Sequence, residues 1–294
     1  MGKLTALTLQ HYNELAGKLI KLTDAELRLT HYFQSHFNEI IYCGITDIAM
    51  NANVSKATIG RYLNKLGFTG YSAFKKSIEL GLKPHQLRSP FAIHHQKESS
   101  AFFSTENIAN QFCYNIQQLV TIFLAQLNIK DLDQLIKLLM DKNKRIFVIG
   151  PSSSFAMAKH FSTLIKYFRD NVTCLSLDTS ELPKEMLHIN KNDILIIFSY
   201  YRFNNIAIEI GKWFKQKNAS IVLVTNSPSN PYGKFTDLQF VLPSEANAIF
   251  QSRIIGFYFI ELILHLCYEK SEGEGNFQAL EELFQYFHTF STNI

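Results

Sequence analysis

The sequence has few cysteines, and none lies where a cysteine-based site would need it. Cys43, Cys113, Cys174 and Cys267 are far apart, and no CxxC pair or Cys–His pair at metal-ligand spacing occurs. This distribution argues against a disulfide framework or a structural zinc site and favours free thiols in a reducing compartment. We therefore expect no metal and no cofactor.

Long apolar runs are also missing. The most apolar stretch, IIGFYFIELILHLCY at 254–268, contains Glu261 and His265. It is shorter than the roughly 20 residues that a membrane-spanning helix needs. The first residues lack the basic-then-apolar pattern of a secretory signal. We expect a cytoplasmic protein in which 249–268 forms an apolar helix. That helix is either buried in its own subunit or packed in a subunit interface.

Acidic residues are scarce in the first third of the chain. Residues 1–90 contain 11 Lys and Arg against 6 Asp and Glu, whereas residues 91–294 contain 18 against 19. The positive charge of the chain therefore comes from its N-terminal third, which suggests an anionic partner for that region. A solvated basic surface would produce the same asymmetry.

The chain divides at a segment without periodicity. LKPHQLRSPFAIHHQKESS at 82–100 carries two prolines and reads as an interdomain linker. We expect a helical domain over 1–81, a linker over 82–101 and a second domain over 102–294. In the second domain, short apolar runs alternate with helical segments, beginning with RIFVIG at 145–150. This alternation predicts an α/β domain with a doubly wound parallel sheet, following an all-α N-terminal domain.

The N-terminal domain contains two short helical segments separated by a tight turn, in TDIAMNANVSKATIGRYLNKLGF at 46–68. The spacing predicts a first helix capped by Thr46 and a second capped by Ser55. An inward stripe follows from the i, i+3, i+4, i+7 spacing of Ile59, Tyr62, Leu63 and Leu66. This arrangement is that of a helix-turn-helix, whose second helix reads base edges in the DNA major groove. A generic helical hairpin would share the periodicity.

The same stretch carries a family resemblance. Residues 46–78 resemble the N-terminal domain of RpiR/MurR-type bacterial transcription regulators, through the pattern VS-x-ATI-x-R-(F/Y)-x-x-KLGF-x-GY-x-x-F-K. The pattern is matched by Val54, Ser55, Ala57, Thr58, Ile59, Arg61, Tyr62, Lys65, Leu66, Gly67, Phe68, Gly70, Tyr71, Phe74 and Lys75. The pattern and the resemblance together suggest these DNA-binding candidates: Thr46, Ser55, Lys56, Ala57, Thr58, Arg61, Tyr62, Lys65, Tyr71 and Lys75.

The resemblance extends to the second domain, because RpiR-type regulators carry a sugar isomerase (SIS) domain that binds phosphosugars at the carboxyl ends of its strands. Three loops at expected strand ends supply candidates: GPSSSF at 150–155, FSYYRFNN at 198–205 and VTNSPSNPYGKFTD at 224–237. The ligand-binding candidates are Ser152, Ser153, Ser154, Ser199, Tyr201, Arg202, Asn204, Thr225 and Asn226.

The second of these loops departs from the family pattern Ser-x-Ser-Gly-x-Thr/Ser. Tyr201, Arg202 and Asn204 stand where the second Ser, the Gly and the Thr are expected. A glycine there would let backbone N–H groups approach a phosphate. Arg202 can pair with a phosphate or carboxylate, or form a salt bridge with a neighbouring acid.

The leading hypothesis is a transcription factor that binds a double-stranded DNA operator and responds to a small-molecule effector, as a homodimer or homotetramer. One alternative is a phosphosugar isomerase, for which Glu181, Glu185 and His188 are candidate bases. None of these stands in a recognisable motif, so no catalytic residue is assigned. The other alternative is a regulator that senses a metabolite other than a phosphosugar.

Overall fold

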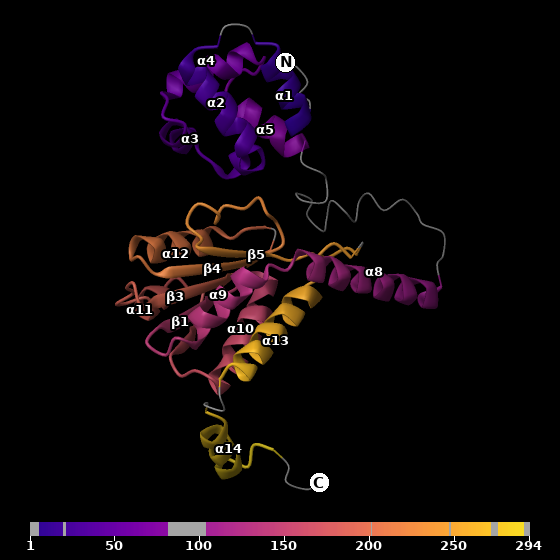
Figure 1. Ribbon diagram of the computed structural model, residues 1–294, viewed down its shortest axis with the longest axis vertical. Coiled ribbons are helices and arrows are strands. Elements are labelled where there is room, and N and C mark those ends of the chain that lie inside the picture. The colour runs from indigo at the N-terminus through magenta and orange to yellow at the C-terminus, as the bar shows by residue number, and fades with distance from the viewer. Residues whose placement is uncertain are drawn as a thin grey trace. The chain divides into compact units, whose positions relative to one another are not determined.

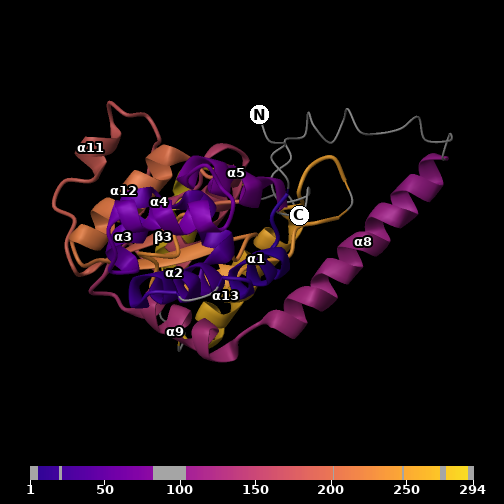
Figure 2. The ribbon, with the colours of Figure 1, turned by 90° about the horizontal axis from the view of Figure 1, so that it is seen from above.

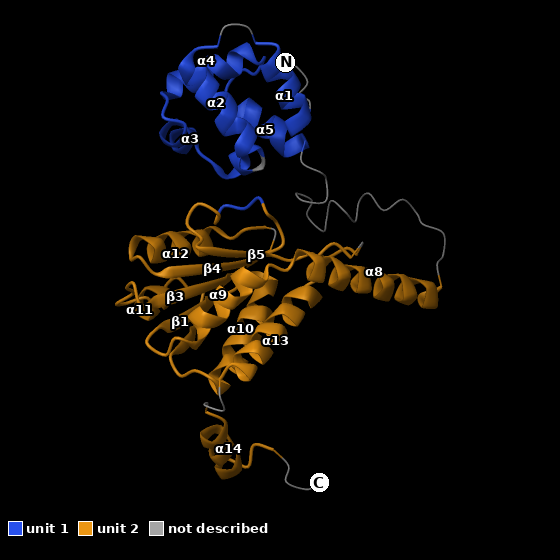
Figure 3. Ribbon diagram, in the orientation of Figure 1, with its two compact units in different colours: residues 1–96, 229–231 blue, residues 97–228, 232–294 orange. Residues whose placement is uncertain are grey.

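The computed structural model describes residues 6–19, 22–81, 104–200, 202–246, 248–271 and 276–290. They form two compact units, one N-terminal and one C-terminal, which Figure 3 colours separately. The predicted linker at 82–101 lies outside the described residues. Within the described parts of the chain, no helix has the length and apolarity that crossing a bilayer requires.

The N-terminal unit is entirely helical (Figure 1). Its core is aromatic and includes Tyr12, Phe33, Phe37 and Phe74, with ring centroids 5.0–6.1 Å apart for the pairs that meet. Its elements are α1 (Leu9–Gly17), α2 (Asp24–Ser35), the 3-10 helix η1 (Phe37–Tyr42), α3 (Ile45–Asn51), α4 (Lys56–Lys65) and α5 (Tyr71–Gly81).

Local signals explain most of these boundaries. Thr23 and Glu26 form a capping box at the start of α2, with Thr23 N donating to Glu26 Oε2 at 2.9 Å. Helix α2 ends before His36, where the backbone leaves the helical region at φ −123° and the chain continues as η1. Helix α1, capped by Thr8, was not among the helices that the sequence pattern predicted.

The C-terminal unit contains the predicted parallel sheet. All four strand pairings are parallel, in the order β2-β1-β3-β4-β5. The strands are β1 (Arg145–Ile149), β2 (Val172–Cys174), β3 (Asp193–Phe198), β4 (Ser220–Thr225) and β5 (Leu238–Val241). The helices are α8 (Thr105–Gln126), α9 (Ile129–Met140), α10 (Phe155–Leu164), α11 (Leu182–Glu185), α12 (Asn205–Gln216), α13 (Ile254–Glu269) and α14 (Phe277–Tyr286), with the 3-10 turns η2 (Ser152–Ser154) and η3 (Ile165–Tyr167).

Helices cover both faces of this sheet (Figure 1). Alternate side chains of β1 and β3 explain why: Val148 and Ile196 join a core with α8, α9, α10 and α13, whereas Phe147 and Ile197 join a core with α12. The chain changes faces around β1 and β3. In a doubly wound sheet with this order, ligands bind beyond the carboxyl ends of the strands at that point.

Two apolar helices differ in how much of their surface is covered. Helix α13 begins at Ile254 rather than at 249 and buries Phe259, Ile263 and Cys267 among others, so it is a core helix of its own subunit. Helix α8 extends away from the sheet (Figure 2) and buries only Leu119 and Phe123.

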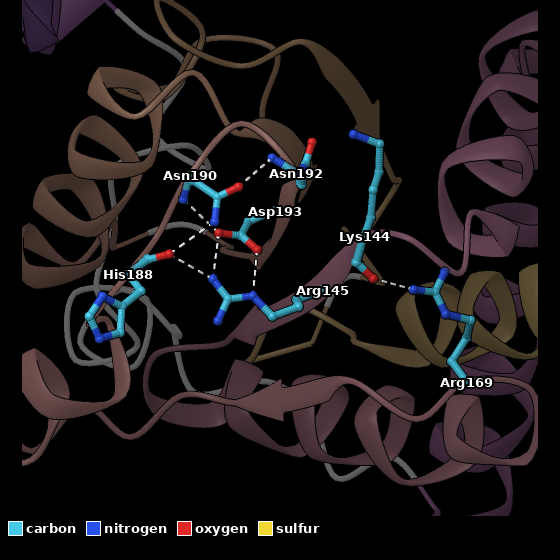
Figure 4. Close-up of polar contacts among 7 residues, drawn as sticks. All are labelled: Lys144, Arg145, Arg169, His188, Asn190, Asn192 and Asp193. Atoms are coloured by element: carbon cyan, nitrogen blue, oxygen red, sulfur yellow. Dashed lines mark hydrogen bonds and ion pairs between the residues drawn. The ribbon is translucent and has the colours of Figure 1, made fainter.

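A charged network joins the amino ends of β1 and β3 (Figure 4). Asp193 is fully buried and accepts hydrogen bonds from Arg145 Nε at 2.8 Å and Arg145 Nη2 at 2.9 Å. It also accepts one from Asn190 N at 2.7 Å. Because both residues begin neighbouring strands, this bidentate pair fixes the register at the sheet edge opposite the predicted ligand loops.

Candidate functional sites

The turn between α3 and α4 positions the second helix as predicted. Asn53 adopts a left-handed backbone at φ +52°, which asparagine tolerates better than most residues. Val54 N donates to Ala49 O at 2.9 Å and closes the turn. Ser55 caps α4, with its hydroxyl accepting from Thr58 N at 3.1 Å. The local sequence therefore sets the angle at which α4 leaves α3.

Helix α4 buries one face and exposes the other. Ile59, Tyr62 and Leu63 are fully buried against the N-terminal core. Ser55, Lys56, Ala57 and Arg61 are exposed on the opposite side, and Thr58 is partly exposed beside Ser55. Asn64, three residues after Arg61, is exposed too, and its amide has the donors and acceptors that read adenine. Asn64 is not among the DNA-binding candidates that the sequence pattern suggests.

One DNA-binding candidate and one predicted helix cap need correction, and a DNA contact by Thr46 stays a prediction. Tyr62 is 0% exposed, and its hydroxyl lies 2.9 Å from that of Tyr12 and 2.6 Å from that of Thr30. Burial raises its pKa, so it is a neutral core residue that DNA cannot reach. Thr46 is exposed but lies within α3, which begins after Gly44, so its predicted role as the helix cap is wrong.

Three further candidates are tied to their own domain. Lys65 Nζ lies 2.6 Å from Glu26 Oε1, and this ammonium, with the Thr23 N–H, lowers the pKa of the buried Glu26. The Tyr71 hydroxyl donates to Cys43 O at 2.6 Å, and Lys75 Nζ donates to the same carbonyl at 3.4 Å. A DNA contact by Lys65 or Lys75 stays a prediction, and it would have to share the ammonium with these partners.

In the C-terminal unit, the loop after β1 forms a tight cradle before α10. A Cβ on Gly150 would lie 2.3 Å from Ser154 O, so only glycine fits there. Ser152 has φ +53° and is exposed together with Ser153, whereas Ser154 is 3% exposed. A left-handed non-glycine residue at a strand end is the kind of strain that collects at ligand sites.

In the loop after β3, the residue that replaces the family's glycine has a left-handed backbone. Arg202, which replaces that glycine, has φ +68° and is exposed. Asn204 caps α12, its Oδ1 accepting from Ala207 N at 3.1 Å. Ser199 is fully buried, and its hydroxyl lies 2.9 Å from that of Tyr232. Tyr201 lies outside the described residues.

The loop after β4 is bonded to the segment before α13. Asn226 Nδ2 donates to Ser244 Oγ at 2.9 Å and to Gln251 Oε1 at 2.6 Å. Thr225 is fully buried and accepts from Ser227 N at 3.5 Å. This bonding brings Ser244 and Gln251 to the carboxyl ends of the strands, a proximity that no sequence pattern predicts.

The candidate isomerase bases do not gather at one place. The main-chain carbonyl of His188 accepts from Arg145 at the amino end of β1 (Figure 4). Glu185 accepts from Ser176 N at 3.0 Å, just after the carboxyl end of β2, and Glu181 pairs with Lys184 at 2.9 Å. The two glutamates therefore have local partners, whereas the contact of His188 is made by its main chain.

The two units together define a class of protein: a helix-turn-helix unit with an exposed second helix, joined to a doubly wound α/β unit with a ligand-type loop cluster. That class is the ligand-responsive transcriptional regulator. Residues 10–84 match the helix-turn-helix domain of the rpiR family, and residues 138–266 match the SIS domain. The chain belongs to the RpiR type of transcriptional regulators.

Two relatives are named as transcriptional regulators, and one solved structure shares the fold. An uncharacterized HTH-type transcriptional regulator of Clostridium perfringens is 27% identical over 271 residues, covering 92% of this chain and 94% of the relative. The HTH-type transcriptional regulator GlvR of Bacillus subtilis is 25% identical over 234 residues, covering 80% and 81%. The Vibrio vulnificus NanR protein complexed with ManNAc-6P superposes with a TM-score of 0.56 at 14% identity, covering 97% and 100%.

Proposed function

We propose that this regulator binds its operator through the exposed face of α4 and changes its affinity for DNA when the SIS domain binds a phosphosugar or a related anion. An effector acts only through its differential affinity for the two arrangements of the protein. The observation that carries the DNA part is the division of α4 into a fully buried stripe and an exposed row of polar and basic side chains.

Within that row, the residue types assign the roles. Ser55, Thr58 and Arg61 have side chains that hydrogen-bond to base edges, and Arg61 is suited to guanine. Lys56 stands in the first turn of α4, where it and the free backbone N–H groups hold phosphates. Ala57 contributes apolar contact, for instance with a thymine methyl group.

The phosphosugar part is supported by the loops at the carboxyl ends of β1, β3 and β4. The serines at the start of α10 combine hydroxyls with the first N–H groups of a helix, which is a general anion-binding arrangement. The structural neighbour NanR carries ManNAc-6P, which makes that phosphosugar the first probe to test.

We propose sensing rather than catalysis. Aldose–ketose isomerisation needs a base close to the substrate carbonyl. Among the candidates, the Glu181 carboxylate is paired with Lys184 and the Glu185 carboxylate accepts from Ser176 N. The named relatives are transcriptional regulators. An isomerase assay with a panel of sugar phosphates separates the two functions.

We also propose that the protein acts as a homodimer or homotetramer in the cytoplasm. Helix α8 exposes several large apolar side chains, an arrangement that favours a partner of the same kind. They are Ile108, Phe112, Tyr114, Ile122 and Leu124. Sedimentation of wild type and Phe112→Glu tests this, since a monomeric wild type would contradict it.

The experiment for DNA binding compares Arg61→Ala with Lys130→Ala, an exposed basic residue of the C-terminal unit. Fluorescence anisotropy is measured with duplex DNA from the region upstream of the chain's own gene. We expect Arg61→Ala to weaken binding by about 1–3 kcal/mol, the contribution of one good base contact. Lys130→Ala should leave binding unchanged. Wild-type affinity of the folded Arg61→Ala variant would contradict the assignment.

A further inference from the structure

The first turns of α10 and α13 meet at the side chain of Tyr200. Met157 is the third residue of α10, and Gly256 is the third residue of α13. A Cβ on Gly256 would lie 2.4 Å from Met157 Sδ and 2.9 Å from Tyr200 Oη. Glycine in a helix is destabilising, so its presence here reflects this close approach. The amino ends of two helices therefore converge beyond the carboxyl end of β3.

The electrostatic potential is expected to be positive where the amino ends of α10 and α13 converge. The first N–H groups of a helix have no partner within it and carry a positive partial charge. Asn204 caps α12, whereas neither α10 nor α13 has a side-chain bond from its cap residue. In α13, Ser252 Oγ accepts from Ile254 N at 3.2 Å.

Arg253 adds a full charge at the start of α13. Its guanidinium carbon lies 5.4 Å from the centroid of the Tyr200 ring, and Nη1 donates to Gln251 O at 2.6 Å. Its Nε is buried without a hydrogen-bond partner, and it forms no ion pair with any described residue. Burial lowers the pKa of Arg253.

Tyr200 is the second group without a partner. It is 3% exposed, and its buried hydroxyl makes no hydrogen bond with any described residue. Buried polar groups are nearly always paired, so an unpaired hydroxyl on a ring that lies against a guanidinium with an unpaired nitrogen needs an explanation. An acceptor that carries negative charge would satisfy both groups.

Building on the proposed sensing function, we propose that Arg253 and Tyr200 hold the anionic group of the effector, a phosphoryl or carboxylate, at the amino end of α13. Arg253 supplies a positive charge from the start of α13, in addition to the exposed Arg202 of the β3 loop. Tyr200 lies in the loop at 198–205 that the sequence pattern singles out, but neither Tyr200 nor Arg253 is among the ligand-binding candidates.

The test is calorimetric titration of the full-length protein with four probes: inorganic phosphate, ManNAc-6P, its unphosphorylated sugar and a hexuronate. We expect Arg253→Gln to weaken binding of the anionic probes about 10- to 100-fold, the loss expected for a charge-assisted hydrogen bond. Lys159→Gln removes one exposed positive charge from α10 and serves as the charge-matched control. Preference for ManNAc-6P or for the hexuronate distinguishes a phosphoryl group from a carboxylate.

Tyr200→Phe keeps the ring under Arg253 and removes only the unpaired hydroxyl. We expect its Tm without ligand to equal or exceed that of the wild type, while its affinity for the anionic probe falls. A purely structural role for Tyr200 would not separate these two measurements. Failure of every anionic probe to bind the wild type would overturn the sensing function and this proposal with it. Wild-type binding that survives both substitutions, or that is lost in Arg202→Gln instead, would overturn this proposal alone.

Discussion

The two units use their polar side chains in opposite ways. On α4, the side chains proposed to contact DNA project from a helix whose opposite face is fully buried, and most of them are exposed. At the strand ends of the C-terminal unit, Ser199, Asn204 and Asn226 are already bonded to their own subunit. A DNA surface must meet a long duplex from outside, whereas an effector site closes around a small molecule. The DNA-binding surface can therefore be located from the exposure of its side chains. The effector site can be located only when the hydrogen-bond partners of each polar group are known.

The largest loss of stability is expected for a substitution of Asp193, which lies in the C-terminal unit. Asp193→Ala removes the acceptor of three hydrogen bonds at the amino ends of β1 and β3, and we expect a loss of about 2–3 kcal/mol. Arg145 is 40% exposed, so hydration limits the loss. Chemical denaturation followed by Trp213, the single tryptophan, reports on the C-terminal unit. A variant as stable as the wild type would show that the network does not hold the sheet edge.

A smaller loss is expected for Tyr62→Phe, which tests whether Tyr62 serves the core or the DNA. The change leaves the buried Tyr12 hydroxyl without its partner and should lower stability by about 1–2 kcal/mol. Operator affinity, measured well below the Tm, should equal that of the wild type. A selective loss of operator affinity would restore Tyr62 as a DNA contact.

Glu26 gives the N-terminal unit a dependence on pH. Its pKa is lowered in the folded protein by Lys65 and the Thr23 N–H, so its contribution is present above its unfolded pKa and is lost as pH falls through the folded one. We expect Glu26→Gln to cost about 1 kcal/mol near neutral pH, because Lys65 is partly exposed. The difference from wild type should shrink as acid is added below about pH 4.5. A difference that stays constant across that range would contradict the ion pair.

Gly60 tests how α4 meets DNA. Apart from the neighbouring backbone of α4 itself, no described atom lies within 4 Å of a Cβ built at Gly60, so Gly60→Ala should stabilise the N-terminal unit by about 0.5–1 kcal/mol. Thermal unfolding followed by circular dichroism measures the gain. If operator affinity falls while stability rises, Gly60 allows a close approach to DNA. If affinity is unchanged, glycine at this position has no role in recognition.

Gly60 is a glycine at a helical position, whereas Arg202 in the C-terminal unit is a residue with a side chain at a position that favours glycine. Its left-handed φ of +68° disfavours any residue with a Cβ, so Arg202→Gly should raise stability by about 0.5 kcal/mol after the larger unfolded-state entropy of glycine is subtracted. A small rise in Tm for Arg202→Gly checks the prediction. Arg202→Ala is the matched control, because alanine keeps a Cβ and therefore keeps the backbone strain. Equal stability of the two variants would show that the loop relaxes to another backbone.

The sequence by itself determined the elements whose signals are local. The apolar spacing of Ile59, Tyr62 and Leu63 identified the buried face of α4, and Ser55 identified its start. The alternation of short apolar runs with helical segments predicted the parallel, doubly wound sheet, because strands covered on both faces need apolar residues at every position. A preference that acts over a few residues can be read from those residues alone.

Only the tertiary structure decided which side chains are available. Tyr62 fits the family pattern but is bonded inside the N-terminal core, and Lys65 meets Glu26 from another helix. Arg253 and Tyr200 are 53 positions apart in the chain and carry no motif, yet the convergence of α10 and α13 places one over the ring of the other. Such pairings depend on how helices pack across a sheet. No local sequence pattern predicts these pairings, because the atoms that pair with a buried polar group, or leave it unpaired, come from distant parts of the chain.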